Sequence, residues 1–248
     1  MPALEENNHR PIRVLVVDDS DVILYALKHF FEDYNFDVIT CIDGLEGLQK
    51  AVELKPNLIF LDLMMPNFDG LKMLQVKKVL QDIKDIPVIV ISANTDRRNV
   101  LAAIEAGADK VISKPLQKEI IFRFVNELLG NRLVDKSLLP QTIIETDQAA
   151  IQKELVNVFL DSFIKKKEAI LTGVQMRNTP VVKSIIHEIK GAGSTIGQPL
   201  LTEIAGEIDK KDISTETDWM FVELKCNQIF QIVKRLEEER KKELGIRN

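Results

Sequence analysis

The feature that most limits how this 248-residue chain can fold is a change of hydrophobic period part-way along it. Between residues 12 and 130, longer amphipathic stretches separate five short apolar runs, which are IRVLVV, DVITC, LIFLDL, PVIVIS and KVIS. Three of these runs are apolar at successive positions, as expected for central parallel strands that helices cover on both faces. The pattern predicts an α/β doubly wound fold around a five-stranded parallel sheet.

From about residue 145 onward, apolar residues recur three and four positions apart instead, which is the period of an amphipathic helix. One such helix begins near Ile151, and further helices are predicted over 179–196, 199–211 and 217–243. Four amphipathic helices without strands predict an all-α domain, an antiparallel four-helix bundle, over residues 145–248.

The predicted domains are flanked and joined by segments without either period. Residues 131–144 are predicted to be a linker, because Gly130 can end a helix and Pro140 can break one. The polar residues 1–11 are predicted to form a disordered N-terminal tail. The lysine run at 165–167 is expected to be a solvated helix face.

Composition excludes several classes of protein. The chain has no apolar run long enough for a signal peptide or a membrane span, so we expect a cytoplasmic protein with no membrane insertion. Its two cysteines, Cys41 and Cys226, are far apart in apolar surroundings and predict buried thiols. The net charge of −5 argues against neutralisation of phosphates, so we expect protein partners and no nucleic acid.

Polar residues gather where the predicted strands end. Asp18 and Asp19 follow the first apolar run, Asp62 lies at the third, Ser92 at the fourth and Lys114 at the fifth. In a doubly wound sheet, ligands bind beyond these carboxyl ends. Clustered carboxylates require a cation, and oxygen ligands favour a hard divalent ion such as Mg²⁺. A carboxylate beside this ion can attack phosphorus, while the lysine and the serine hold phosphate oxygens.

Four segments resemble the receiver domain of bacterial-type response regulators, which has a flavodoxin-like fold. They are VLVVDDS at 14–20, FLDLMMPNFDG at 60–70, VISA at 90–93 and GADKVISKP at 107–115. This resemblance identifies residues 12–130 as a receiver domain.

The resemblance also implies roles for individual residues. Asp62 would be the phosphoacceptor, and Asp62, Asp19 and the backbone carbonyl of Met64 would ligate Mg²⁺ or Mn²⁺, with Asp18 acting through water. Lys114 and Ser92 would bind the phosphoryl group, and Pro66 and Gly70 would shape the adjacent loop. The peptide bond before Pro115 is often cis in the family, and the sequence leaves its isomer open. Val111 departs from the family, which usually has an aromatic switch residue there.

The third histidine of the chain lies on a predicted helix. On a helical wheel of about 100° per residue, His187 is roughly 150° from the apolar sector, so it is expected to face solvent. Lys183, Lys190, Gly191 and Ser194 share its face. An exposed neutral imidazole is a nucleophile, the lysines would offset phosphoryl charge, and Gly191 would leave room for the active-site edge of a partner.

The segment HEIKGAGSTIG at 187–197 resembles the signature of histidine-containing phosphotransfer (HPt) domains, which is His-x-x-Lys-Gly with a glycine ten residues after the histidine. The adjoining segments FLDSFIKKKEAILTGVQ and LLTEIAGEID match the flanking helices of that family. The resemblance implies that His187 is a second phosphoacceptor and that Lys190 and Gly191 belong to its site.

Together these features predict a phosphorelay signal-transduction protein, a receiver fused to an HPt domain. Its partners would be an upstream histidine kinase or HPt donor and a downstream receiver domain. The chain lacks an ATP-binding kinase motif, so we expect a phosphotransfer intermediate rather than a turnover enzyme, with a receiver that catalyses its own phosphorylation and slow dephosphorylation.

Two other hypotheses remain beside this one. In the first, only Asp62 is phosphorylated, and the helices form an inert interaction scaffold. In the second, the chain is a phosphohydrolase with an aspartate nucleophile, which is disfavoured because Leu63 and Met64, rather than a second aspartate, follow Asp62. The sequence leaves open whether phosphoryl transfer from Asp62 to His187 occurs within one chain.

Overall fold

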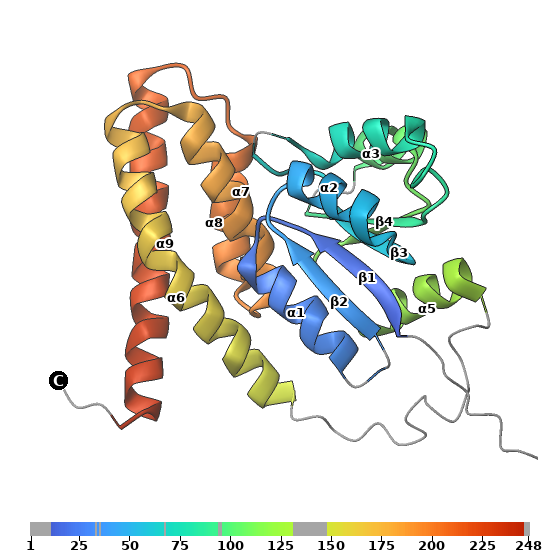
Figure 1. Cartoon of the computed structure of the whole chain (residues 1–248). Helices are drawn as coiled ribbons and strands as arrows, with labels where there is room; N and C mark the ends of the chain where they lie inside the picture. The colour runs from blue at the N-terminus through green and yellow to red at the C-terminus, as the bar shows by residue number, and fades with distance from the viewer. Residues whose placement is uncertain are drawn as a thin grey trace, which may run out of the picture.

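The computed structural model describes residues 11–32, 34, 36–66, 68–93, 96–130 and 148–245. Its first half contains a five-stranded parallel sheet, as the sequence predicted (Figure 1). The strand order in the sheet is β2-β1-β3-β4-β5. The strands are β1 (Ile12–Val17), β2 (Phe36–Cys41), β3 (Leu58–Asp62), β4 (Val88–Ser92) and β5 (Lys110–Ser113).

Helices cover both faces of this sheet. Helices α1 (Asp21–Glu32) and α5 (Lys118–Leu129) share one apolar core with the sheet, and α2 (Gly44–Leu54), α3 (Gly70–Val79) and α4 (Arg97–Ala106) share the other. Along β1, Val14 and Val16 point into the first core, while Leu15 and Val17 point into the second. Side chains alternate between the two faces of a strand, so burial on both sides explains the uninterrupted apolar run.

Aspartates fix where three of the covering helices begin. The side chains of Asp43, Asp69 and Asp96 accept hydrogen bonds from backbone N–H groups in the first turns of α2, α3 and α4. These caps satisfy donors that have no partner within the helix. They set the ends of the loops that lead from the strands into the helices.

The second half of the chain is all-helical. Its helices are α6 (Gln148–Gln175), α7 (Thr179–Thr195), α8 (Pro199–Lys210) and α9 (Glu216–Glu243), which begin and end close to the predicted positions. Helix α6 packs against α7 and α9, and α8 packs against the same two helices. Their shared core includes Phe159, Phe163, Ile186, Ile189, Val222 and Ile229.

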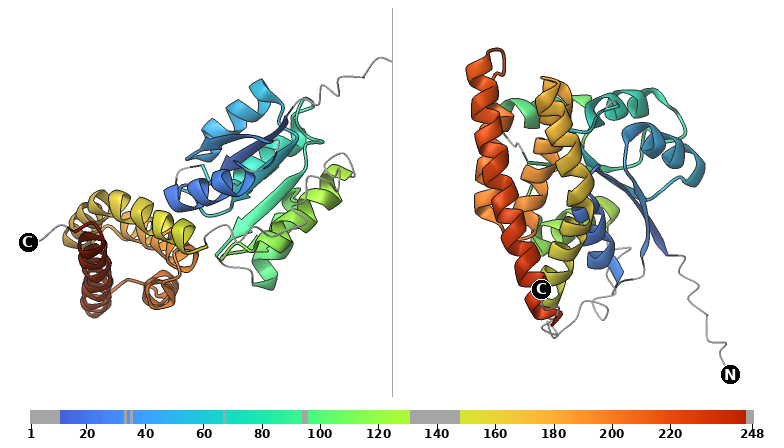
Figure 2. Two further views of the ribbon diagram at one scale, coloured as in Figure 1. Left: turned by 90° about the horizontal axis from the view of Figure 1, so that it is seen from below. Right: turned by 90° about the vertical axis from the view of Figure 1, so that its left-hand side faces the viewer.

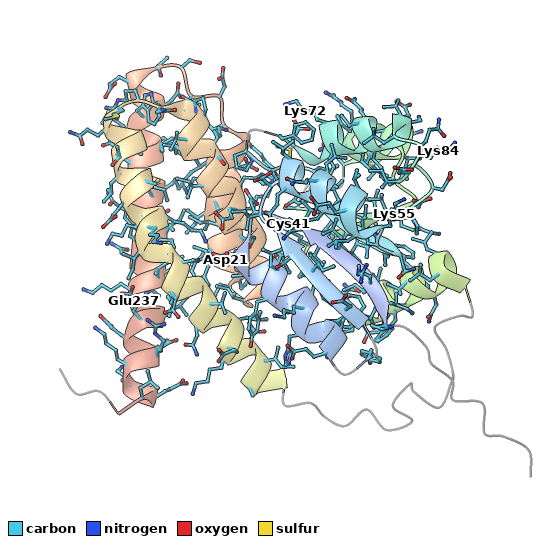
Figure 3. The ribbon with its side chains drawn as sticks, viewed as in Figure 1. Asp21, Cys41, Lys55, Lys72, Lys84 and Glu237 are labelled. Carbon is cyan, nitrogen blue, oxygen red and sulfur yellow. The ribbon has the colours of Figure 1, made fainter. Side chains whose placement is uncertain are left out.

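The two halves are in contact along helix α1. This helix packs against α6 and α7, and Figures 1 and 2 show the C-terminal helices as a group beside the α/β half. Val22 of α1 is fully buried in the core of the C-terminal helices, where Tyr25 and Ala26 also pack. Asp21, at the start of α1, is labelled in Figure 3 at this boundary.

Cys41 and Cys226 are free buried thiols, as predicted. The predicted tail falls almost wholly, and the predicted linker entirely, outside the described residues. Within the residues that the structure describes, no helix has the length and apolar character needed to cross a membrane. The lysine run is not uniformly solvated, because the Lys166 side chain is only 13% exposed at the contact between the two halves.

Candidate functional site

Three carboxylates meet at the carboxyl edge of the sheet. Oxygen atoms of Asp18, Asp19 and Asp62 lie within 4.8 Å of one another. Asp18 Oδ1 accepts a hydrogen bond from the Ser20 N–H at 2.9 Å, and Asp62 Oδ1 accepts one from the Met64 N–H at 3.0 Å. The sequence-predicted residues are therefore brought together, because adjacent parallel strands end at the same edge.

Lys114 joins two of these carboxylates. Its Nζ donates to Asp62 Oδ2 at 2.6 Å and to Asp18 Oδ2 at 2.9 Å, and its side chain is 3% exposed. Burial alone would lower the pKa of Lys114, but the two carboxylates outweigh this effect and raise it. The Lys114 N–H donates to the carbonyl of Ser92 at 2.9 Å, which brings buried Ser92 to the same edge. The peptide bond between Lys114 and Pro115 is cis.

The electrostatics of the cluster suit a hard divalent cation. Burial, together with the charge of Asp62 and against the opposing charge of Lys114, raises the pKa of Asp18 to about 7. Burial, followed by the charges of Asp18 and Asp62, raises the pKa of Asp19 to about 8. A single lysine therefore leaves negative charge uncompensated at this edge, and a cation bound by the carboxylate oxygens would neutralise it.

The loop after β3 is held tightly to this site. Gly70 begins α3, and its N–H donates to the Leu63 carbonyl at 3.1 Å. A Cβ on Gly70 would lie 2.0 Å from the carbonyl oxygen of Asp62, so only glycine fits. Met64, by contrast, has an exposed side chain beside the site. Val111, where the family usually has an aromatic switch, is half-buried against the core beneath α2, α3 and α4.

The second predicted acceptor is buried, and the expectation that it faces solvent is wrong. His187 is 8% exposed, and its Nδ1 lies 3.1 Å from Asp209 Oδ2. Lys190 Nζ donates to the same oxygen at 3.0 Å. Burial would raise the pKa of Asp209, but hydrogen bonds to His187 and Lys190 outweigh it and lower that pKa to about 2.

The ionised Asp209 carboxylate fixes which ring nitrogen of His187 is the donor. An ionised carboxylate can only accept hydrogen bonds, so Nδ1 of the ring must be the donor, and in a neutral imidazole the lone pair is then on Nε2. Among the described residues, this buried Nε2 has no hydrogen-bond partner. A buried polar atom of this kind is costly to leave unpaired and requires an explanation.

The helical wheel failed here because it considers only one helix. Lys183, which shares the histidine's face, donates to carbonyls at the C-terminal end of α8, including those of Ile208 at 2.8 Å and Lys211 at 2.6 Å. Those carbonyls have no partner within their own helix, so Lys183 caps α8 instead of offering a free charge. The face of α7 that carries Lys183, His187 and Lys190 is thus covered by the C-terminal end of α8.

Next to this face, at Gly191, helix α7 meets the α/β half. A Cβ on Gly191 would lie 3.3 Å from Lys114 Cδ and 3.5 Å from its Nζ. Glu188 forms a 2.6 Å ion pair with Lys166, whose Nζ is 4.0 Å from an Asp21 carboxylate oxygen. The two predicted sites therefore face one another in the same chain.

Comparison with known proteins identifies the family. The family model of the response regulator receiver domain matches residues 14–126. RpaA of Synechocystis, a DNA-binding dual master transcriptional regulator, is 30% identical over 206 residues, which are 82% of this chain and 81% of that protein. This chain is a response regulator. The transcriptional regulatory protein PrrA of Mycobacterium leprae is 32% identical over 69% of this chain and 74% of its own.

Among solved structures, the chemotaxis protein CheY4 of Vibrio cholerae is 26% identical, with a TM-score of 0.46 over 48% of this chain and 99% of that chain.

One expectation about partners is contradicted by the relatives of this response regulator. We expected no nucleic acid, yet RpaA and MtrA of Mycolicibacterium paratuberculosis, which is 33% identical over 56% of this chain, are both named as DNA-binding regulators. The expectation rested on net charge, which averages over the whole chain and does not describe any local surface. It is withdrawn.

Cation binding to the receiver is expected to weaken as the pH falls. Because the pKa values of Asp18 and Asp19 are about 7 and about 8, protons compete with the cation for these carboxylates below pH 8. The apparent Mg²⁺ affinity should fall about tenfold per pH unit for each proton displaced. Calorimetric titrations from pH 6 to 8.5 would measure this, with Asp19→Asn as a control that shows a shallower dependence. A flat profile in the wild type would contradict the prediction.

Asp209→Asn is expected to make this response regulator less stable, and by a larger amount at pH 7 than at pH 3. The folded-state pKa of Asp209, about 2, lies below its ordinary value of 3.8, so the carboxylate stabilises the fold above pH 4. That contribution is lost as the pH falls toward 2, and it is on the order of 2 kcal/mol at pH 7. Urea unfolding of both proteins at pH 7 and pH 3 would test this. Equal differences at the two pH values would contradict it.

Three residues near His187 and at the contact between the two halves were missed by sequence reasoning. Asp209 lies in a segment that matched a flanking helix, and Glu188 lies within the quoted signature, but neither was singled out. Lys166 was treated as part of a solvated run. Only the ion pairs of the folded chain reveal them, because their partners are distant in sequence or on other helices.

Proposed function

We propose that this response regulator is a phosphorelay intermediate, in which a receiver domain (12–130) is joined to an HPt domain (145–248) built as an antiparallel four-helix bundle. Asp62 and His187 are the two phosphoacceptors. One observation carries the proposal: Gly191, one helical turn after the histidine, lies directly against Lys114 of the receiver site. An inert scaffold would have no need of an imidazole oriented by a carboxylate beside that site.

At the receiver, an Asp62 carboxylate oxygen attacks phosphorus, and the bond from phosphorus to the donor's histidine breaks. Asp19, Asp62 and the Met64 carbonyl, with Asp18 through water, would hold Mg²⁺ or Mn²⁺. This cation would neutralise charge on the carboxylates and the phosphoryl oxygens. Lys114, which now pairs with Asp62, moves its hydrogen bond to a phosphoryl oxygen, and the Ser92 hydroxyl donates to another. Hydrolysis of the acyl phosphate is slow, so the chain acts as an intermediate and not as a turnover enzyme.

At the helical domain, Asp209 keeps the proton on Nδ1 of His187, and Nε2 is the nucleophile. Lys190 shares the Asp209 carboxylate and lies within reach of a phosphoryl group on the ring. Gly191 has no side chain, which lets the receiver edge approach. These features support an acceptor that exchanges its phosphoryl group with a receiver aspartate.

Label transfer from a cognate histidine kinase or an HPt donor tests the proposal. Wild type should carry both acyl phosphate and phosphohistidine and pass the label to a downstream receiver. Asp62→Asn should accept no label from the kinase, and His187→Gln should carry only acyl phosphate and should not pass it on. Base hydrolyses the acyl phosphate and acid hydrolyses phosphohistidine, which separates the two species. If His187→Gln passes label as well as the wild type, the HPt assignment fails.

A second candidate function follows from the relatives. The match to RpaA spans 206 residues, well beyond the receiver residues 14–126, and that protein is named as a DNA-binding regulator. The C-terminal helices would then bind DNA once Asp62 is phosphorylated. Fluorescence anisotropy with duplex DNA, with and without a beryllofluoride phosphate mimic, would test this, since phosphate contacts make such binding strongly salt-dependent. Binding that is absent at low salt in both states would exclude it.

A further inference from the structure

Receiver and C-terminal helices meet at the two proposed acceptor sites. We infer that the phosphoryl group passes between Asp62 and His187 within a single chain, and that this docked arrangement hides both acceptors from outside partners until the two halves separate. The inference rests on the proposed function and specifies the partner of each site. The sequence had left open whether transfer occurs within or between chains.

The first support is the contact between Gly191 and Lys114. Lys114 Nζ already bonds Asp62, so the position 3.5 Å from this Nζ lies at the mouth of the receiver site. At 3.3 Å from Lys114 Cδ, a Cβ at position 191 would be closer than ordinary van der Waals contact, so a side chain there would require the lysine to shift, whereas glycine leaves it in place. Helix α7 therefore sits on the same edge of the sheet as the phosphoacceptor.

The second support is the position of His187 on α7. At about 100° per residue, the histidine lies between Lys190, which faces α8, and Gly191, which faces the receiver. Its Nε2 is buried without a partner among the described residues. A phosphoryl group held at the receiver edge would give this atom a bonding partner, which explains why the fold leaves it unpaired.

The third support is the contact of α1 with α6 and α7, which is called the seam below. Val22 of α1 is fully buried against the C-terminal helices and belongs to their core, not to a core of the sheet. Lys166 ties the seam by pairing with Glu188 and lying 4.0 Å from Asp21. Farther along α1, a cavity of about 350 Å³ lies between Phe30, Leu116 and Leu155. A contact that combines apolar packing, charged residues and a cavity is typical of domains that can separate.

The transfer step conserves atoms and charge. Nε2 of neutral His187 attacks the phosphorus of the Asp62 acyl phosphate, a P–N bond forms, and the P–O bond to the carboxylate breaks. The electron pair of the broken bond returns to Asp62 as a carboxylate, and the imidazole retains its Nδ1 proton in the hydrogen bond to Asp209. The reverse step uses the same atoms, so the docked chain can carry the phosphoryl group in either direction.

A complementation experiment separates transfer within a chain from transfer between chains. The full-length wild type, Asp62→Asn, His187→Gln and an equal mixture of the two variants are incubated with labelled acetyl phosphate and Mg²⁺. At about 1 µM protein, wild type should form phosphohistidine about a thousandfold faster than the mixture, because a tethered domain has an effective concentration in the millimolar range. The wild-type rate should not depend on protein concentration. A mixture that matches wild type would overturn the inference and leave the proposed function intact.

A seam variant tests the docking directly. Val22→Glu places a charge in the buried contact and should slow transfer within the chain about tenfold or more. Label on Asp62 should persist, which shows that the receiver is folded. Val52→Glu is the matched control, because Val52 lies exposed on α2, on the other face of the sheet, and should leave the transfer rate unchanged. Equal transfer rates in the wild type and Val22→Glu would overturn the inference.

Accessibility of His187 provides a readout that does not depend on phosphate. Diethyl pyrocarbonate should modify His187 slowly in the wild type, in which the ring is 8% exposed, and severalfold faster in Val22→Glu. Val52→Glu serves as the reference in the same peptide map, because its substitution lies away from the contact between the two halves. Failure of any protein or mixture to form phosphohistidine would instead sink the proposed function, and an unchanged reactivity of His187 would sink only the docking.

Discussion

Gly70→Ala is expected to lower the free energy of unfolding by about 3 kcal/mol and to abolish phosphorylation of Asp62. The new Cβ would lie 2.0 Å from the carbonyl oxygen of Asp62 and 2.9 Å from its carbonyl carbon. Both atoms belong to the backbone, so no side-chain rotation relieves the clash. The last residue of β3 must shift, and its carboxylate then leaves the position that Lys114 now contacts.

The matched control for this change is Gly206→Ala in α8. The nearest atom to a Cβ there is Lys190 Cε at 4.0 Å, which is ordinary contact. Alanine is favoured over glycine in a helix by about 1 kcal/mol, so this variant should be as stable as the wild type or slightly more stable. Urea unfolding and labelling by acetyl phosphate would compare the two variants. Equal stability of both would show that the loop after β3 has more room than its geometry indicates.

Lys114→Met is expected to destabilise the chain by about 3 kcal/mol at pH 8, because it leaves two buried carboxylates without their cation. Lys114 holds down the pKa of Asp18, so its loss raises that pKa further above the ordinary value. The folded state of the variant then favours protonated aspartate, and its stability falls as the pH rises. The deficit should therefore be largest at pH 8 and much smaller at pH 5.

Urea unfolding at these two pH values, without divalent cations, measures the effect. Lys110→Met is the control, because the Lys110 pair with Glu127 is solvent-exposed and such pairs contribute about 0.5 kcal/mol. Added Mg²⁺ should recover part of the stability lost in Lys114→Met, since the cation neutralises the same carboxylates. A deficit that is equal at pH 5 and pH 8 would contradict the role given to Lys114.

Much of the receiver site could be predicted, because each of its residues is marked by the short segment in which it lies. Each of its polar residues ends or follows an apolar run, and adjacent parallel strands bring those ends to one edge. Asp19, Asp62 and Lys114 meet for that reason alone. The pairing of Lys114 with Asp62 joins residues 52 positions apart, but the register of the strands already requires their proximity.

The environment of His187 could not be predicted in the same way. The helical wheel places His187 away from the apolar sector of α7, but the conclusion that the histidine meets solvent was wrong. Asp209, its partner, is 22 residues away on another helix, and no periodicity marks that pair. On the remaining side, Lys114 of the receiver approaches Gly191, one turn after the histidine, which single-helix patterns cannot report.

The succession of strands and helices along the chain and the residues at the carboxyl edge could be predicted from the sequence, because hydrophobic period and strand ends are properties of short segments. Only the folded chain reveals that α7 lies on the receiver site, that His187 is buried and paired with Asp209, and that Lys166 is part of the seam. Those outcomes depend on how two preformed units dock. Docking is set by complementary shape and charge between segments far apart in the chain, which no local pattern contains.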